Sequence, residues 1–137
     1  MNIEKVEHIA INVRDIERSR DFYGRILGFK PLESVDCGEC VIHYFQVPDG
    51  SRMELFQYKA PQDNPPRRES DGGLRHLAFR VVDVAAHEQV LRAEGITITL
   101  PTCDLPNLSA RVLLFLDPDG VTLEFCEKLP GQGDQIG

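Results

Sequence analysis

The chain has 137 residues and a net charge of −7, from 15 basic and 22 acidic residues. This length fits one compact domain that buries most of its apolar surface without disulfide bonds, and a hydrophobic fraction of 42% is ordinary for a globular protein. The acidic balance argues against nonspecific nucleic-acid binding and against an anionic membrane surface, since both need many Lys and Arg.

The N-terminal segment does not begin with a basic stretch followed by about 7–15 apolar residues, as a signal peptide does. No run approaches the ~20 apolar residues of a membrane span. We therefore expect a cytoplasmic protein, in which the cysteines stay reduced. Cys37 and Cys40 have CxxC spacing, but a zinc ribbon needs a second pair and a thioredoxin-type motif opens a helix. We interpret both as turn residues, and their role stays open.

In chain order, the first half predicts a strand, a helix and three further strands. Asp15 suits the N-cap of the helix and Gly28 its end. Asp49-Gly50 is a strong hairpin signal between the last two strands. The expected ranges are 6–13, 16–27 for the helix, 29–35, 41–47 and 52–58.

The second half predicts the same order of elements. Asp83 begins the helix, Gly95 follows it, and Asp119-Gly120 marks the hairpin. The linker 59–73 is polar and rich in Pro, Asp and Gly, and 129–137 resembles a flexible tail. The expected ranges are 74–82, 83–94 for the helix, 96–100, 111–116 and 121–127.

The two halves also repeat chemistry-bearing residues. The segment HIAINVRD at 8–15 recurs as HLAFRVVD at 76–83, and Pro-Asp-Gly with a glutamate four residues beyond it recurs at 48–54 and 118–124. We therefore predict an α+β fold of two tandem βαβββ modules, about 4–58 and 74–127, within a single domain over 1–128.

Side chains two apart on a strand share a face. In the strand 6–13 the odd-numbered apolar residues suit the helix side, which places His8 on the opposite face. The same reasoning places Glu54, His76 and Glu124 on faces turned away from the helices. If the two sheets form one concave surface, or cup, two histidines and two carboxylates meet on its floor.

A single polar residue on such a face is ordinarily satisfied by local hydrogen bonds or by solvent. Four of them in duplicated positions favour metal ligation, because imidazole and carboxylate bind Zn²⁺, Ni²⁺, Co²⁺, Mn²⁺ or Fe²⁺. Four protein ligands on an octahedral ion leave two positions for water or substrate oxygens. We predict one divalent ion, of open identity, at His8, Glu54, His76 and Glu124.

The segments HIAINVRDIERSRDFYGRILGF, GLRHLAFRVVDV and FLDPDGVTLEF resemble the vicinal oxygen chelate superfamily over residues 4–127. That superfamily includes glyoxalase I, methylmalonyl-CoA epimerase, fosfomycin-resistance proteins and extradiol dioxygenases. The resemblance implies two βαβββ modules that build a metal-binding cup in which the metal chelates vicinal oxygens of a small-molecule substrate. It also implies a homodimer, with the site inside one chain or shared between two.

The glutamate at position 54 distinguishes among members of the family. Dioxygenases and fosfomycin-resistance proteins use two histidines and one glutamate, and the epimerase usually carries glutamine where Glu54 stands. Glyoxalase I has a glutamate at this position, which serves as the fourth metal ligand. Its bacterial forms, however, carry an arginine where Asn12 stands and an asparagine where Tyr58 stands. Those differences argue against glutathione as the substrate.

Asn12 and Tyr58 are themselves candidates for substrate binding, and three further residues join them. Arg80 and Arg111 are expected to hold an anionic substrate group. If Asp49-Gly50 is a two-residue loop, His43 lies opposite Phe56 and lines the cup.

We expect a metal-dependent lyase or isomerase of the glyoxalase I type. Glu124 or Glu54 would move a proton next to a metal-bound carbonyl or enediolate. An acyl-CoA epimerase is the alternative within the same class. A binding or resistance protein without turnover is the alternative from another class.

Overall fold

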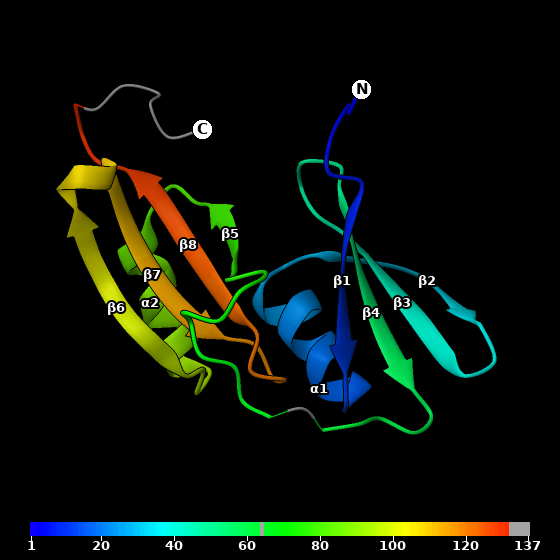
Figure 1. The fold of residues 1–137 in the computed structure, drawn as a ribbon. Coiled ribbons are helices and arrows are strands. Elements are labelled where there is room, and N and C mark those ends of the chain that lie inside the picture. Colours follow the sequence, from blue (N-terminus) through cyan, green and yellow to red (C-terminus); the bar gives the residue numbers. More distant parts are fainter. Residues whose placement is uncertain (64, 132–137) are drawn as a thin grey trace. The chain divides into compact units, whose positions relative to one another are not determined.

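The computed structural model describes residues 1–63 and 65–131. The protein is α+β, with two four-stranded mixed sheets that each carry a helix (Figure 1). The chain divides into two compact units, residues 1–65 and 66–137, and each holds one βαβββ module. The predicted fold class and the duplicated module are therefore confirmed.

The first unit has strand order β1-β4-β3-β2, so the first and last strands of the module pair in parallel at one side of the sheet (Figure 1). Its core lies between the sheet and the helix, where Val13, Phe22, Tyr23 and Leu55 are almost wholly buried. The elements are β1 (His8–Val13), α1 (Ile16–Arg20), a π-helical segment η1 (Asp21–Ile26), β2 (Lys30–Asp36), β3 (Cys40–Gln46) and β4 (Arg52–Tyr58).

The first helix begins as predicted and continues differently. The Asp15 side chain accepts a hydrogen bond from the backbone N–H of Arg18 at 3.2 Å, which is the geometry of an N-cap. From Asp21 the α-helix gives way to the π-helical segment, in which the Leu27 N–H donates to the Phe22 carbonyl. The prediction of one continuous α-helix over 16–27 was wrong in this respect, because amphipathic spacing does not separate an i→i−5 turn from an i→i−4 turn.

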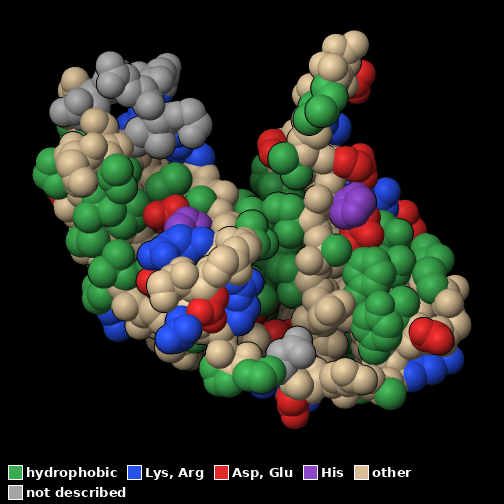
Figure 2. Space-filling view, in the orientation of Figure 1, with side chains coloured by type: hydrophobic (Ala, Val, Ile, Leu, Met, Phe, Trp, Pro, Cys, Tyr) green, Lys and Arg blue, Asp and Glu red, His purple; other side chains and the backbone are tan. Residues whose placement is uncertain are grey.

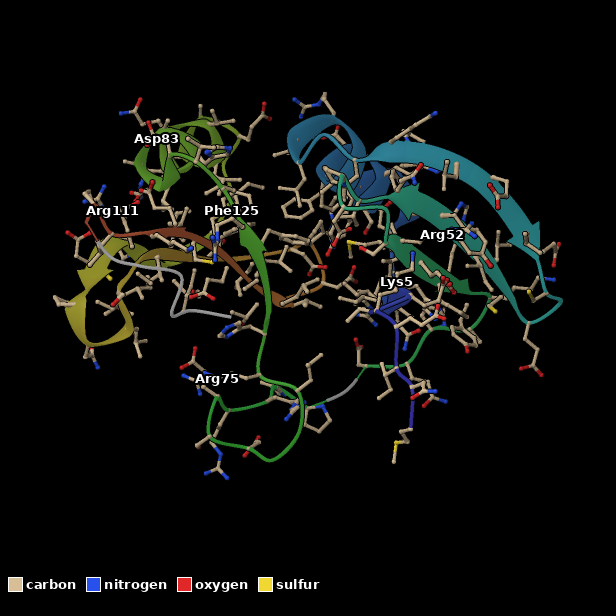
Figure 3. The ribbon with its side chains drawn as sticks, turned by 90° about the horizontal axis from the view of Figure 1, so that it is seen from above. Lys5, Arg52, Arg75, Asp83, Arg111 and Phe125 are labelled. Atoms are coloured by element: carbon tan, nitrogen blue, oxygen red, sulfur yellow. The ribbon has the colours of Figure 1, made fainter. Side chains whose placement is uncertain are left out.

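The second unit repeats the topology with strand order β5-β8-β7-β6. Asp83 caps α2 by accepting from the Ala86 N–H at 3.0 Å, and Gly95 follows the helix with a φ of +74°. Figure 3 shows Phe125 on the side of the sheet that carries α2, where it packs on Phe115. The elements are β5 (Leu77–Arg80), α2 (Val84–Ala93), β6 (Ile98–Leu105), a 3₁₀ turn η2 (Pro106–Leu108), β7 (Ala110–Leu116) and β8 (Thr122–Lys128).

Both hairpins carry longer loops than the Asp-Gly signals predict. In the first, the Val47 N–H donates to the Ser51 carbonyl and the Gly50 N–H, at a φ of +92°, donates back to Val47. Residues 47–51 therefore form the loop, Gln46 pairs with Arg52, and Tyr44 rather than Phe45 pairs with Glu54. The predicted register was wrong by one residue, which moves every side chain of β3 to the other face relative to β4.

The segment between the modules contains neither helix nor strand among its described residues. Its second part is held by Arg67, whose guanidinium donates to the carbonyls of Asp71, Gly72 and Leu74. Of the predicted tail, residues 132–137 lie outside the described residues. No helix in the described part of the chain is long and apolar enough to cross a membrane.

Candidate metal centre

The first unit brings together a histidine and a glutamate from its two parallel strands. The Nδ1 atom of His8, the first residue of β1, lies 3.1 Å from a carboxylate oxygen of Glu54 on β4. Because His8 is in register with Arg52, and Ala10 with Glu54, the imidazole has only to lean along the strand to reach the carboxylate. The small side chain of Ala10 leaves room for it. Glu54 is 8% exposed, whereas the His8 side chain is 42% exposed.

The second unit contains an equivalent pair. The Nε2 atom of His76 lies 3.2 Å from a carboxylate oxygen of Glu124. Ala78 is in register with Glu124, as Ala10 is with Glu54. His76 itself precedes β5, so the strand is shorter than predicted, but the pair still forms, through Nε2 of His76 where His8 uses Nδ1. In both units, histidine side chains lie beside acidic side chains at the surface (Figure 2).

A third potential ligand accompanies the first pair. A Glu7 carboxylate oxygen lies 3.3 Å from His8 Nδ1, and ligand atoms of Glu7, His8 and Glu54 all lie within 4.8 Å of one another. Sequence reasoning missed Glu7 because neighbouring residues on a strand point to opposite faces. The structure begins β1 only at His8, which leaves Glu7 free of that alternation.

The donor set of each pair fits a divalent ion. Imidazole nitrogen and carboxylate oxygen are the ligands that Zn²⁺, Ni²⁺, Co²⁺, Mn²⁺ and Fe²⁺ accept. Each pair is already assembled within its own unit and combines a shielded glutamate with a more exposed histidine. Metal binding would thus require little rearrangement of either pair.

Three predicted substrate-binding residues share a face with these pairs. Asn12 lies on β1 at even spacing from His8, and Tyr58 ends β4 at even spacing from Glu54. Arg80 ends β5, where it is in register with Cys126 of β8. All three are exposed, as a group that meets a ligand must be.

His43 lies on the opposite face, which corrects the expectation that it lines the cup. It is in register with Leu55, whose side chain is wholly buried beneath the helix. Its Nδ1 accepts a 2.8 Å hydrogen bond from Arg20 Nη2, with Ser34 Oγ 2.9 Å from the same nitrogen. Its Nε2 lies 3.1 Å from the amide oxygen of Gln57. The longer hairpin loop is the physical reason, because it shifts the register by one.

Arg111 is also placed differently from the expectation of a guanidinium available to substrate. Figure 3 shows it on the side of the sheet that carries α2. Its Nε donates to Asp104 at 2.6 Å, and its Nη1 lies 3.4 Å from Glu127. The hydrogen bond from Arg111 holds the pKa of Asp104 below its ordinary value, so the pair stays charged and mutually satisfied.

One aromatic and one basic side chain lie next to Glu54, and neither was predicted to belong to the site. Tyr44 lies opposite Glu54 across β3 and β4, and the Arg52 guanidinium stacks over the Tyr44 ring at 4.1 Å. Arg52 also donates to Glu33 at 2.9 Å. The corrected register is the signal that would have found Tyr44, since it decides which β3 residues share the face of Glu54.

A family model described as Glyoxalase/Bleomycin resistance protein/Dioxygenase superfamily matches residues 5–125. The chain therefore belongs to that superfamily, which confirms the resemblance inferred from its sequence. A solved structure of a glyoxylase/bleomycin resistance protein/dioxygenase domain from Frankia sp. EAN1pec superposes with a TM-score of 0.82 at 28% identity, covering 96% of each chain.

Several curated proteins are similar in sequence over nearly the whole chain. YwkD of Bacillus subtilis, described as uncharacterized, is 35% identical over 130 residues, covering 93% of this chain and all of YwkD. The mitochondrial methylmalonyl-CoA epimerase of Dictyostelium discoideum is 29% identical, covering 93% of this chain and 81% of its own. The lactoylglutathione lyase of Haemophilus influenzae is 27% identical, covering 90% and 92%.

Proposed function

We propose that this protein is a metal-dependent lyase or isomerase of the glyoxalase I type, which transfers a proton next to a substrate carbonyl. The observation that carries the proposal is the duplicated histidine–glutamate pair. Each unit holds one pair in the same strand register, with contacts of 3.1 and 3.2 Å. A structural hydrogen bond explains one such pair, but it gives no reason for the same pair to recur at the same register.

The proposal requires both pairs to hold one ion, within one chain or between two chains of a homodimer. His8, Glu54, His76 and Glu124 would be the protein ligands. A bound divalent ion supplies a Lewis acid that polarises a carbonyl oxygen. The chain's own contribution is to fix the two imidazoles and to place a carboxylate beside the reacting carbon.

Glu124 or Glu54 would accept that proton and return it, because a carboxylate within hydrogen-bond reach is an adequate base when the carbon acid is activated. The two glutamates differ in access. The Glu54 side chain is 11% exposed and adjoins Tyr44 and Arg52, whereas Glu124 is 17% exposed and opens onto a cavity. We favour Glu124 as the group that moves, since it has more room to do so.

A homodimer is part of this proposal. Among the described residues each sheet ends in two edge strands, β1 and β2 or β5 and β6, whose unpaired backbone groups a second copy would cover. Light scattering at micromolar concentration should give the mass of two chains. The mass of one chain would contradict the dimer.

The relatives support more than one reaction within this class. The similarity to a lactoylglutathione lyase favours the glyoxalase type, and that to a methylmalonyl-CoA epimerase favours an acyl-CoA epimerase as the second candidate. Both reactions move a proton on the carbon next to a carbonyl. The two reactions differ in the part of the substrate that lies away from the reacting carbon. Asn12 and Tyr58 offer no positive charge to the two carboxylates of glutathione.

The test begins with elemental analysis of the purified protein. One divalent ion per chain is expected, and its absence even after reconstitution with Ni²⁺, Co²⁺, Zn²⁺ or Mn²⁺ would overturn the metal centre. A panel of hemithioacetals and acyl-CoA thioesters then identifies the reaction. We expect the glutathione hemithioacetal of methylglyoxal to be a poor substrate. Metal binding without turnover of any member would favour a binding or resistance protein.

A further inference from the structure

A cavity of about 460 Å³ lies on the helix-free face of the second sheet, within the second unit alone. It begins at Glu124 and follows β8 toward its end, so it is continuous with the proposed metal centre. The 3₁₀ turn after β6 forms one wall. Its lining includes Arg80, Asn107, Val112, Glu124, Cys126 and Lys128.

Arg80 differs from every other arginine described in the second unit. Arg67 donates to backbone carbonyls, and the others pair with carboxylates: Arg68 with Asp71, Arg75 with Glu69, Arg92 with Glu88 and Arg111 with Asp104. Among the described residues Arg80 has neither kind of partner. Its guanidinium instead lies by the Cys126 thiol, whose pKa is raised chiefly by burial.

The cavity is electrically polar along its length. Glu124 stands at one end, and Arg80 and Lys128 contribute positive charge at and beyond Cys126. Glu127 also lines the cavity, but its carboxylate pairs with Arg111 at 3.4 Å. Residues two apart on a strand lie about 7 Å apart, so Arg80, in register with Cys126, is offset from Glu124 by about that distance. A ligand in the cavity would therefore meet the metal centre at one end and a guanidinium at the other.

The first unit has no such charge at the matching positions. Asn12 follows His8 by four residues as Arg80 follows His76, and Tyr58 follows Glu54 by four as Lys128 follows Glu124. The neutral pair and the cationic pair thus occupy equivalent places on the two sheets. The cationic pair is therefore a feature of the second unit alone.

We propose that this cavity is a subsite for an anionic group, a carboxylate or a phosphate, which Arg80 binds while the other end of the substrate lies at His76 and Glu124. The substrate is then a small acid rather than a neutral carbonyl compound. An anion at Arg80 would form charge-assisted hydrogen bonds, stronger than those between neutral groups, and Asn107 lines the same cavity. This inference rests on the proposed function, because it assumes that a metal ion holds the opposite end of the substrate.

The test uses the full-length protein loaded with Co²⁺, whose visible spectrum reports ligands at the metal. Two probes are compared, acetohydroxamate and the half-hydroxamate of succinic acid, which share a chelating group and differ by one carboxymethyl group that carries the negative charge. We expect the acidic probe to bind about ten-fold more tightly or better, as a charge-assisted hydrogen bond predicts. Arg80→Gln should reduce that preference to about two-fold or less and leave acetohydroxamate unaffected, and Arg80→Lys should restore part of it.

Arg92→Gln is the matched control, because it removes the same charge from α2, on the other face of the sheet. It should retain the full preference. Equal binding of the two probes by the unsubstituted protein, or equal loss in Arg80→Gln and Arg92→Gln, would overturn the subsite while acetohydroxamate binding still supported the metal centre. No spectral response to acetohydroxamate would overturn the proposed function, and the subsite with it.

Discussion

The two modules share one strand register but differ in the side chains that surround the histidine–glutamate pair. In each, an alanine of the first strand lies in register with the glutamate of the last, and the histidine two residues earlier reaches that glutamate. Nearby, the first module has Tyr44 opposite its glutamate, whereas the second has Leu114. Backbone pairing therefore preserves the pair of ligands, while the side chains beside it are free to differ.

The hydrogen bonds that join the helix to the sheet also differ between the modules, because a basic side chain forms them in the first and an acidic one in the second. In the first module Arg20, the last residue of α1, reaches Ser34 on β2 and His43 on β3. In the second, Glu88 on α2 accepts from the backbone N–H of Thr102 on β6 at 2.7 Å and pairs with Arg92. Both pairs, 20 with 34 and 88 with 102, are separated by the same distance along the chain. The connection between these elements is retained although its chemistry is not.

The largest expected effect tests whether the two ligand pairs contribute equally. His8→Ala and His76→Ala should each weaken Co²⁺ or Zn²⁺ binding by more than about 100-fold. Mutating a residue that only hydrogen-bonds to a metal ligand already lowers metal affinity by about 10–100-fold, so removing a ligand itself should cost more. Isothermal titration calorimetry measures this, with His87→Ala on α2 as a control that keeps full affinity. Loss in only one of the two variants would show that a single unit holds the ion.

The next effect tests whether the modules fold together. Met53 and Leu123 are buried in equivalent places, 1% and 0% exposed, so Met53→Ala and Leu123→Ala should each cost about 2–5 kcal/mol in the free energy of unfolding. If 1–128 is one domain, each variant shifts a single urea transition monitored by circular dichroism. Two transitions, of which each variant shifts only one, would instead mean that the modules unfold independently.

A smaller effect concerns the polar network under the first helix. Leu113 of the second module occupies the place of His43, so His43→Leu introduces the side chain that the second module uses there. It removes the acceptor of the Arg20 hydrogen bond and should cost about 1 kcal/mol, since Arg20 is partly exposed and regains water. Metal affinity and substrate KM should not change. A rise in KM with no loss of stability would instead indicate that His43 contacts the substrate.

The smallest effect is a difference in response to acid. Hydrogen bonds from Thr102, with the Arg92 guanidinium, lower the pKa of Glu88 to about 2 from an ordinary value of 4.5. Because the folded-state pKa is depressed, this contribution is complete above pH 4.5 and is lost as the pH falls toward 2. Glu88→Gln should lower Tm slightly at pH 7 and flatten its dependence between pH 4.5 and 2.

The exposed Glu39→Gln in the β2–β3 turn is the control for that measurement and should leave the pH profile of Tm unaltered. Identical profiles for Glu88→Gln and the unsubstituted protein would show that the tie to Thr102 contributes nothing in solution.

The sequence by itself determined the features that depend on local periodicity. Alternation along a strand assigned His8 and Glu54 to the helix-free face, and the Asp15 and Asp83 caps set the starts of both helices. The repeat of these signals 68 to 70 residues later then predicted two modules of one kind. Such signals involve residues a few positions apart, so no knowledge of distant contacts is needed to read them.

Only the tertiary structure decided how the strands match and which charges are already paired. The Val47–Ser51 hydrogen bonds lengthen the loop and move His43 to the helix side. Three strands bring Asp104, Arg111 and Glu127 together, which satisfies the guanidinium, whereas Arg80 is left facing a cavity. Register and ion pairing depend on partners far along the chain, and a shift of one residue reverses every face. The same sequence pattern is therefore compatible with either placement until the sheet is formed.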